Sequence, residues 1–246
     1  MPRADALYVA LIAVGLGLDS LVSWPAFLRR AQDQPSRARV WLWSTTMMML
    51  WTLLAVGVAL WTFERRSWTE LRLVVPHGWR LLGTIVLLLA VAVAYARSVA
   101  RITRRDRSRR IKVSKAVELR APHTGTELAW FWGLALSAGI CEEFIFRGYL
   151  IWLFQSVLGL WGAAAVSLVL FAAAHSYQGA KGVIAVAVVG GVLTLIVLAF
   201  GSLISAMAVH TLVDVGEGLV GWLAMREVRA MRDGDARPGE RLLDAV

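Results

Sequence analysis

The chain has 246 residues, of which 58% are hydrophobic and only 17% are charged, and its mean hydropathy is +0.63. These values exclude an ordinary soluble domain and are typical of a polytopic membrane protein. The formal net charge of +9 does not indicate nucleic-acid binding, because the basic residues lie in the gaps between apolar stretches, as membrane topology requires. We therefore predict an all-α bundle of seven or eight transmembrane helices, with membrane lipids around it and no nucleic-acid partner.

Three apolar spans form the N-terminal part of the chain: Ala6–Trp24, Val40–Phe63 and Trp79–Ala96. The first could be taken for a signal peptide, but an acidic residue, Asp19, interrupts it and no small-residue cleavage site follows, so we interpret it as an anchor. We expect Asp19 to lie near the membrane interface or to cap a helix end, where a charge costs little. The alternative is that it lines a cavity or a proton path.

A long polar segment, residues 97–123, follows the third span and contains ten basic residues. We interpret it as a cytoplasmic loop that touches anionic lipid head groups. The excess of basic residues on the cytoplasmic side then places the C-terminal tail inside and the N-terminus outside. This topology puts Arg65, Arg66 and Arg72 on the outer side, which is its weak point.

Four hydrophobic stretches follow the basic loop: Glu127–Gly159, Leu160–His175, Val183–Phe200 and Leu203–Ala224. The first is too long for one perpendicular helix, since about 20 residues cross a membrane, so it is either strongly tilted or bent along the interface. The small pair Gly190 and Gly191 would let another helix approach closely. Gly216-x-Gly218-x-x-Gly221 matches a dinucleotide-binding pattern, but it lies in an apolar helix with no strand before it, which favours a packing role.

Three charged residues stand inside the first of these stretches: Glu142, Glu143 and Arg147. An ionised carboxylate in hydrocarbon is costly, so two adjacent ones require a physical reason. Glu143 and Arg147 are four residues apart, which places them on one helical face where they can form an ion pair. Glu142 has no such local partner, and this is the first indication of function.

Two of the four histidines also lie in apolar spans. His175 ends its span, and His210 lies one helical turn before Asp214. Polar groups in a bilayer are found together or beside a water-filled cavity, because isolated burial is so unfavourable. We therefore predict that these residues converge with Glu142 and Glu143 on one cavity, reached from the cytoplasmic side.

The predicted cavity raises a problem of depth. Glu142 lies about 22 Å of helix beyond Glu127, whereas His175 lies near the inner end of its span. The two side chains meet if residues 127–136 lie along the interface or if the helix is steeply tilted.

Such a set of side chains can activate water, either directly through a general base or through a bound divalent metal. A zinc site would take Glu142, His175 and His210 as ligands, with Asp214 as a fourth ligand or as their support. Direct catalysis needs only Glu142 and His175 beside one water, with His210 facing the substrate carbonyl. We favour the direct mechanism over zinc, because Glu142 cannot easily be both a tight ligand and a base.

The motifs Glu142-Glu143-x-x-x-Arg147, Phe171-x-x-x-His175 and His210-x-x-x-Asp214, in this order, resemble those of the CPBP family. This family contains CAAX prenyl endopeptidases of the Rce1 type and the bacteriocin-processing or immunity proteins of the Abi group. The resemblance divides the chain into an N-terminal three-span region at 1–126, a catalytic core at 127–224 and a polar tail at 225–246.

The resemblance implies an intramembrane endopeptidase that cuts a membrane-anchored or C-terminally modified substrate, here in a bacterial inner membrane. Glu142 would activate the water with help from His175, while His210 and Asp214 would hold the oxyanion or complete a metal site. Glu143 would form a structural pair with its arginine. The alternative is a non-catalytic immunity or chaperone-like protein on the same scaffold.

One position departs from the family pattern. Asp214 stands where prenyl endopeptidases commonly have asparagine. An ionised aspartate cannot donate a hydrogen bond to an oxyanion, so we expect Asp214 to orient His210 or to bind metal. The departure weakens the prediction of a prenylated substrate.

Overall fold

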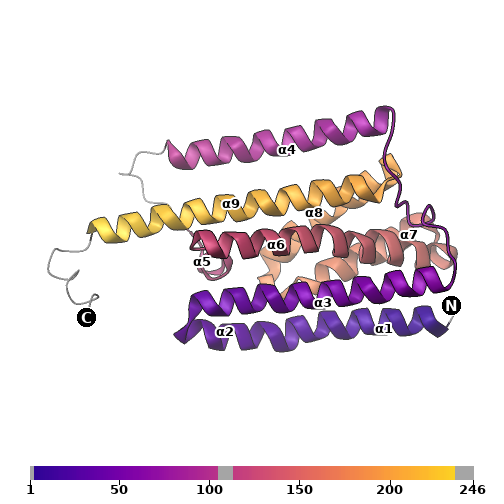
Figure 1. The fold of residues 1–246 in the computed structure, drawn as a ribbon, viewed down its shortest axis with the longest axis horizontal. Helices are drawn as coiled ribbons and strands as arrows, with labels where there is room; N and C mark the ends of the chain where they lie inside the picture. Colours follow the sequence, from indigo (N-terminus) through magenta and orange to yellow (C-terminus); the bar gives the residue numbers. More distant parts are fainter. Residues whose placement is uncertain (1–2, 105–112, 236–246) are drawn as a thin grey trace.

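The computed structural model describes residues 3–104 and 113–235, and in these ranges the chain forms helices and connections without any strand (Figure 1). The predicted all-α fold is therefore confirmed. The α-helices are α1 (Arg3–Leu18), α2 (Trp24–Asp33), α3 (Pro35–Phe63), α4 (Trp79–Thr103), α5 (Lys115–Arg120), α6 (Gly125–Glu142), α7 (Ile151–Ala174), α8 (Gly179–Phe200) and α9 (Leu203–Asp235). Residues 105–112 of the predicted basic loop and 236–246 of the tail lie outside the described ranges.

Three shorter segments join helices end to end. The π-helix η1 (Asp19–Ser23) joins α1 to α2, and a second π-helix, η2 (Glu143–Leu150), joins α6 to α7. The 3₁₀ turn η3 (Ser176–Gln178) joins α7 to α8. A π-helical stretch within an α-helix is rare and is frequently found at a functional site, and both π-helices here begin at or beside an acidic residue.

Six helical runs of the described chain are long and apolar enough to cross a membrane, so the protein is an integral membrane protein with multiple spans. They are Arg3–Asp33, Pro35–Phe63, Trp79–Thr103, Gly125–Ala174, Ser176–Phe200 and Leu203–Met231. The fourth run joins two of the predicted spans, and the chain turns back inside it at Gly159, whose φ of 68° is a left-handed value that favours glycine. The turn divides this run into two apolar segments, so the six runs contain the seven apolar segments that the sequence predicts.

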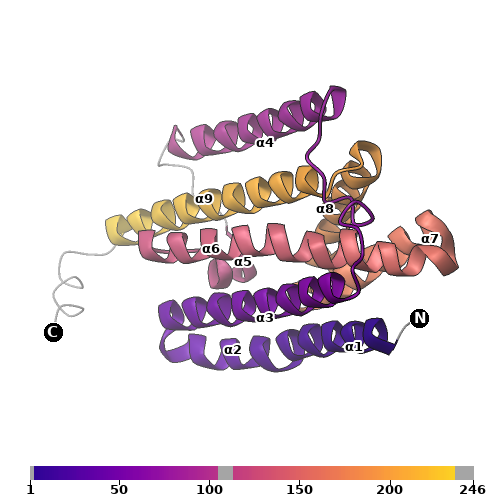
Figure 2. The ribbon, with the colours of Figure 1, turned by 45° about the vertical axis from the view of Figure 1, so that its right-hand side comes forward.

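The long helices lie side by side in an order that Figures 1 and 2 both show: α4, α9, α6, α3 and then α1 with α2. The hairpin formed by α7 and α8 lies against this row, and η2 connects it to α6. Because α6 lies in the middle of the row, its charged C-terminal end is surrounded by protein. Glu142, which is the first indication of function in the sequence, therefore lies in the interior of the bundle.

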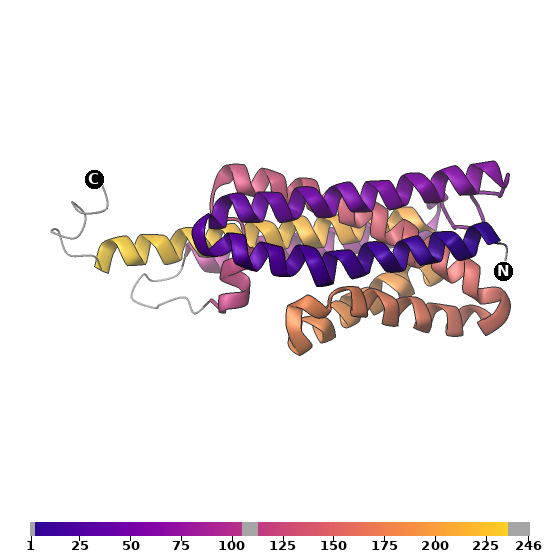
Figure 3. The same cartoon turned by 90° about the horizontal axis from the view of Figure 1, so that it is seen from below.

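A short helix resolves the predicted problem of depth. The part of α7 after Gly159, up to Ala174, spans about 22 Å, and Figure 3 shows its turn into α8 stopping short of the turn between α2 and α3. His175 therefore lies partway along the bundle, where Glu142 also lies. Residues 127–136 belong to α6, which runs beside α3 and α9 (Figure 1), so the convergence does not depend on a separate segment at the start of this stretch.

Buried ion pairs fix the two ends of the bundle. At one end, Arg39 on α3 donates two hydrogen bonds of 2.9 Å to the Glu127 carboxylate on α6. At the other end, Arg66 donates to both oxygens of Asp5 at 2.8 and 3.0 Å, and the Tyr149 hydroxyl donates to the same aspartate. Arg66 is one of the arginines that weaken the predicted topology, and Asp5 offsets its charge.

The sequence predicts a packing role for the dinucleotide-like motif, and two of its three glycines pack against aromatic rings. A Cβ atom on Gly216 would overlap the ring of Tyr95 on α4, and one on Gly218 would overlap the ring of Phe131 on α6. Both glycines lie in the middle of α9. The motif therefore serves the contact between α9 and its two neighbouring helices.

Candidate functional site

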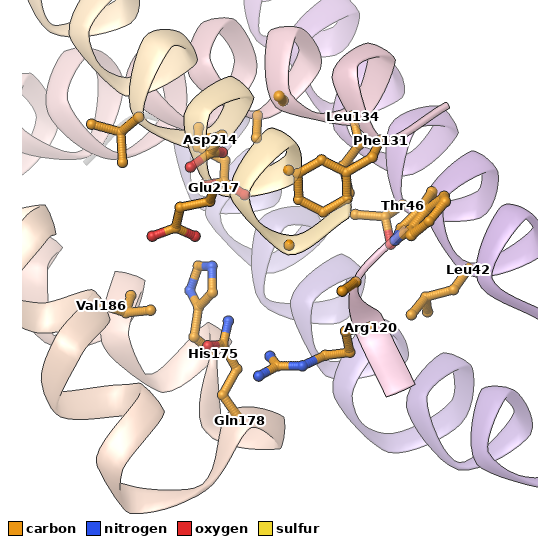
Figure 4. A pocket seen from close by; sticks show the side chains of 18 of the residues that line it. Leu42, Thr46, Arg120, Phe131, Leu134, His175, Gln178, Val186, Asp214 and Glu217 are labelled. Atoms are coloured by element: carbon orange, nitrogen blue, oxygen red, sulfur yellow. The ribbon is translucent and has the colours of Figure 1, made fainter. Parts of the chain in front are cut away.

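A cavity of about 360 Å³ lies among α2, α3, α6, α9 and the turn between α7 and α8. It is lined by four of the five residues predicted to converge: Glu142, His175, His210 and Asp214. Figure 4 shows the side chains of His175 and Asp214 projecting into it from the α7–α8 turn and from α9. The fifth residue, Glu143, is fully buried in the protein behind the cavity wall.

Glu143 connects the helices that carry the other residues. Its Oε1 accepts a hydrogen bond of 2.9 Å from Arg147 Nη1 and one of 2.8 Å from His210 Nδ1. The predicted pair between Glu143 and Arg147 is thus present, with both side chains almost entirely removed from solvent. Its Oε2 has no hydrogen-bond partner within the described chain. The hydrogen bonds that Glu143 accepts from Arg147 and His210 are charge-assisted, which makes them strong where water is excluded.

Arg147 extends the same network to the α7–α8 hairpin. Its Nη2 donates to the Gly190 carbonyl at 3.0 Å, and its guanidinium lies 4.1 Å from the ring centroid of Phe171. A Cβ atom on Gly190 would lie 2.8 Å from Arg147 Nη2, so the predicted close approach is to a side chain. At Gly191 such an atom would meet only Leu168, at 3.8 Å. One ion pair thereby holds η2, α7, α8 and α9 together.

Glu142 differs sharply from its neighbour. It is half-buried and lines the cavity, and its carboxylate has no hydrogen-bond or ion-pair partner among residues 3–104 and 113–235. Consecutive residues of a helix point in different directions, about 100° apart, which explains how one glutamate faces the cavity while the next faces the protein interior. Glu142 is therefore available to a molecule in the cavity.

The His175 ring has a defined orientation. Its Nδ1 lies 2.8 Å from the carbonyl oxygen of Phe171, and because a carbonyl only accepts, Nδ1 carries the proton and donates. In the neutral ring, Nε2 is then an acceptor. Contacts with the rings of Phe171 and Tyr177, with centroids 4.8 and 6.1 Å away, hold the imidazole in place.

His210 lies between two carboxylates. Its Nδ1 donates to Glu143, and its Nε2 is 3.5 Å from Asp214 Oδ2, a distance longer than a normal hydrogen bond. Asp214 is close enough to influence His210 electrostatically, but the shorter contact that orients the ring comes from Glu143. The sequence analysis expects Asp214 in this role because an ionised aspartate cannot donate a hydrogen bond to an oxyanion.

Two further carboxylates line the cavity: Glu217, which sequence reasoning did not assign to the site, and Asp19, for which a cavity-lining position was the alternative. Glu217 lies one turn after Asp214, and Figure 4 shows its carboxylate facing His175. The spacing His210, Asp214, Glu217 places all three on one face of a helix, and this signal could have revealed it. Asp19 is the second. Asp19 does not cap a helix end, because it lies within the Arg3–Asp33 run, and its place on the cavity wall confirms the alternative that the sequence left open.

The residues predicted to bind a metal do not fit one ion in this geometry. Within the described ranges, no three His, Cys, Asp or Glu side chains lie close enough together to hold a metal. His210 Nδ1 already donates to the Glu143 carboxylate, so only Nε2 of this ring remains available to another group. We therefore assign no step of the chemistry to a metal.

Part of the chain matches the model of a known protein family. A family model described as "Type II CAAX prenyl endopeptidase Rce1-like" matches residues 124–216. The matched range contains Glu142, His175, His210 and Asp214 and stops one residue before Glu217, and it does not include the N-terminal helices that carry Asp19. No curated protein and no solved structure matches the chain.

Proposed function

From the Rce1-like type II CAAX prenyl endopeptidase domain that this chain carries at residues 124–216, we propose that it is an intramembrane endopeptidase. It hydrolyses a peptide bond in a membrane-associated protein, near a C-terminal end that carries a lipid or other modification. Water activated by Glu142 and His175 is the nucleophile.

The different environments of the two adjacent glutamates carry this proposal. Glu143 is buried and bonded to Arg147 and His210, so its role is to hold the site together. Glu142 faces a cavity, has no partner in the described chain and shares that cavity with His175. An unpaired carboxylate inside a membrane protein is unfavourable in free energy, and a functional requirement explains why this one is present.

The chemistry follows from these positions. A water in the cavity donates one hydrogen to the Glu142 carboxylate and is oriented by a second hydrogen bond to His175 Nε2. As its oxygen attacks the scissile carbonyl carbon, its proton passes to Glu142. The C–N bond then breaks, and Glu142 returns that proton to the departing amine nitrogen. Glu142 therefore ends the cycle ionised, as it began.

His210 is the candidate for stabilising the oxyanion. Its Nδ1–H is committed to Glu143, so Nε2 is the ring atom that can face the substrate. In its protonated form Nε2 donates to the negative oxygen of the tetrahedral intermediate, and the nearby Asp214 supports the positive ring. An aspartate at this position assists through His210, since it cannot donate the hydrogen bond itself.

The sequence and the fold together support an orientation with the cavity open to the cytoplasm. Arg120, one of the basic residues of segment 97–123, lines the cavity, and the C-terminal half of α9 extends from the same end of the bundle. In a bacterial inner membrane, the positively charged end is the cytoplasmic one. A membrane-anchored substrate would thus present a cytoplasmic C-terminal segment to the site.

Cleavage by purified protein in liposomes tests the proposal. The candidate substrates are a farnesylated C-terminal peptide, a bacteriocin leader peptide and a transmembrane sorting tail. Wild type is expected to cleave at least one of them, and Glu142→Gln to cleave none while it keeps the melting temperature of the wild type. Glu64→Gln makes the same change at an exposed position at the end of α3 and is expected to remain active.

Full cleavage by Glu142→Gln would refute the assignment of the base. If folded wild type cleaves none of the three substrate classes, the result favours a non-catalytic immunity or chaperone-like role on this scaffold.

A further inference from the structure

The N-terminal helices, which lie outside the matched family domain, complete the wall of the cavity. Asp19 and Trp24 both line it, and the π-helical hydrogen bond from the Trp24 N–H to the Asp19 carbonyl defines the turn that presents them. The Ser20 hydroxyl donates to the Ala174 carbonyl at 3.4 Å, so the same turn contacts the end of α7 beside His175. Residues that the family motifs do not contain therefore face the proposed substrate.

Asp19 lacks a compensating positive charge in the described protein. Its Oδ1 accepts a hydrogen bond of 3.1 Å from the Thr46 hydroxyl, and no lysine or arginine of the described chain pairs with it. It lies close enough to Glu142 and His175 to interact with both electrostatically. A hydroxyl offsets only part of the cost of a carboxylate at membrane depth, which leaves Asp19 suited to a cation that arrives from outside the protein.

The surroundings of Asp19 have the chemistry that recognises cations. The rings of Trp24 and Tyr177 lie with their centroids 5.0 Å apart and both line the cavity. Aromatic faces attract ammonium and guanidinium groups, and the attraction strengthens where water is excluded. Tyr177 also interacts electrostatically with Asp19, so the carboxylate and the rings belong to one part of the wall.

The other carboxylates of the cavity also favour the binding of a positively charged group. Besides Asp19, the lining contains Glu142, Asp214 and Glu217, and its one arginine or lysine side chain in the described ranges is Arg120. A cavity with this balance attracts positive groups and repels negative ones. It would disfavour a substrate with acidic residues beside the scissile bond.

We propose that Asp19 is a specificity-determining residue: it binds a lysine or arginine side chain of the substrate close to the scissile bond, against the rings of Trp24 and Tyr177. This inference rests on the proposed function, because the same cavity must hold the peptide. It defines the substrate as a membrane-associated segment with a basic residue beside the cleavage site.

Binding to the Glu142→Gln variant tests the proposal without turnover. The probes are farnesylated peptides in which lysine occupies each position next to the modified cysteine in turn, each matched with a norleucine peptide of equal length. In at least one position the lysine peptide is expected to bind about tenfold more tightly than its norleucine partner. Adding Asp19→Asn should remove this preference, while Asp19→Glu should keep most of it.

Asn at this position retains an oxygen to accept from Thr46, so the fold is expected to survive, with a melting temperature equal to or above that of the parent. Asp33→Asn, the same change at an exposed position at the end of α2, should leave the preference intact. Three results would overturn the inference: equal binding of every matched pair, a lysine preference that survives Asp19→Asn, or no binding by folded protein. Failure of wild type to cleave would count only against the proposed reaction.

Discussion

Replacing Arg147 with alanine tests how the site is held together. The substitution removes a side chain that is 1% exposed, together with its ion pair to Glu143, its hydrogen bond to Gly190 and its contact with Phe171. Glu143, which is 0% exposed, would keep only His210 as a partner. Removing one member of a buried pair typically costs about 3–5 kcal/mol, a large fraction of the roughly 5–15 kcal/mol that stabilises a domain.

The assay is the melting temperature in detergent micelles, together with the amount of protein recovered from membranes. Arg147→Ala is expected to lower both strongly before any specific kinetic defect appears. Arg29→Ala, an exposed arginine on α2, is the matched control and should change little. The double variant Glu143→Gln with Arg147→Met removes both charges together. It should recover more than half of the lost stability, because paired replacement avoids an orphaned charge.

Two outcomes would refute this reasoning. A normal melting temperature with lost cleavage would show that Arg147 acts on substrate. A double variant as unstable as Arg147→Ala would show that packing or the Gly190 hydrogen bond, and not the uncompensated charge, carries the effect.

Three further measurements test the structure. Gly139→Ala should lower the melting temperature, because its Cβ atom would lie 2.9 Å from the Thr211 backbone nitrogen on α9, whereas Gly17→Ala, with nothing within 4 Å, should not; equal effects would contradict the helix contact. Burial lowers the pKa of His123 below its ordinary 6.5, so the unfolded chain takes up the proton first and stability should fall as pH drops through 6.5; the same pH dependence in His123→Gln would contradict this. Cleavage should persist after exhaustive chelation, and loss with recovery on zinc addition would establish a metal enzyme.

Features that depend on neighbouring residues could be predicted from the sequence. Hydropathy located the seven apolar segments, because a helix in a bilayer must satisfy its own backbone and needs about 20 apolar residues, but it did not show that the segment ending at His175 is too short to cross. The pair between Glu143 and Arg147 followed from helical spacing alone. The convergence of Glu142, His175 and His210 followed from the cost of leaving polar groups isolated in hydrocarbon.

Features set by packing between distant segments could not be predicted in the same way. Asp19 reaches the cavity because η1 contacts the end of α7, and no local pattern around Asp19 encodes that contact. Its position in a span is compatible both with an interfacial charge and with a place on a cavity wall, so the sequence leaves these two alternatives open. The bond between Glu143 and His210 joins η2 to α9, a contact between distant segments, and the sequence analysis expects Asp214 instead as the partner that orients His210.

The depth of the site follows from the shortness of the second half of α7. About 22 Å of helix cannot cross a hydrocarbon core of about 30 Å, so the turn that carries His175 and Gln178 stops short of the end of the bundle that the α2–α3 turn marks, as Figure 3 shows. Non-helical backbone at that depth is tolerated only where it is buried in protein or borders water. His175 and Gln178 both line the cavity. Water in the cavity can therefore hydrogen-bond to the non-helical backbone of the turn that ends this short helix. The same feature that places His175 level with Glu142 therefore favours a hydrated cavity, which is what a hydrolytic reaction inside a membrane requires.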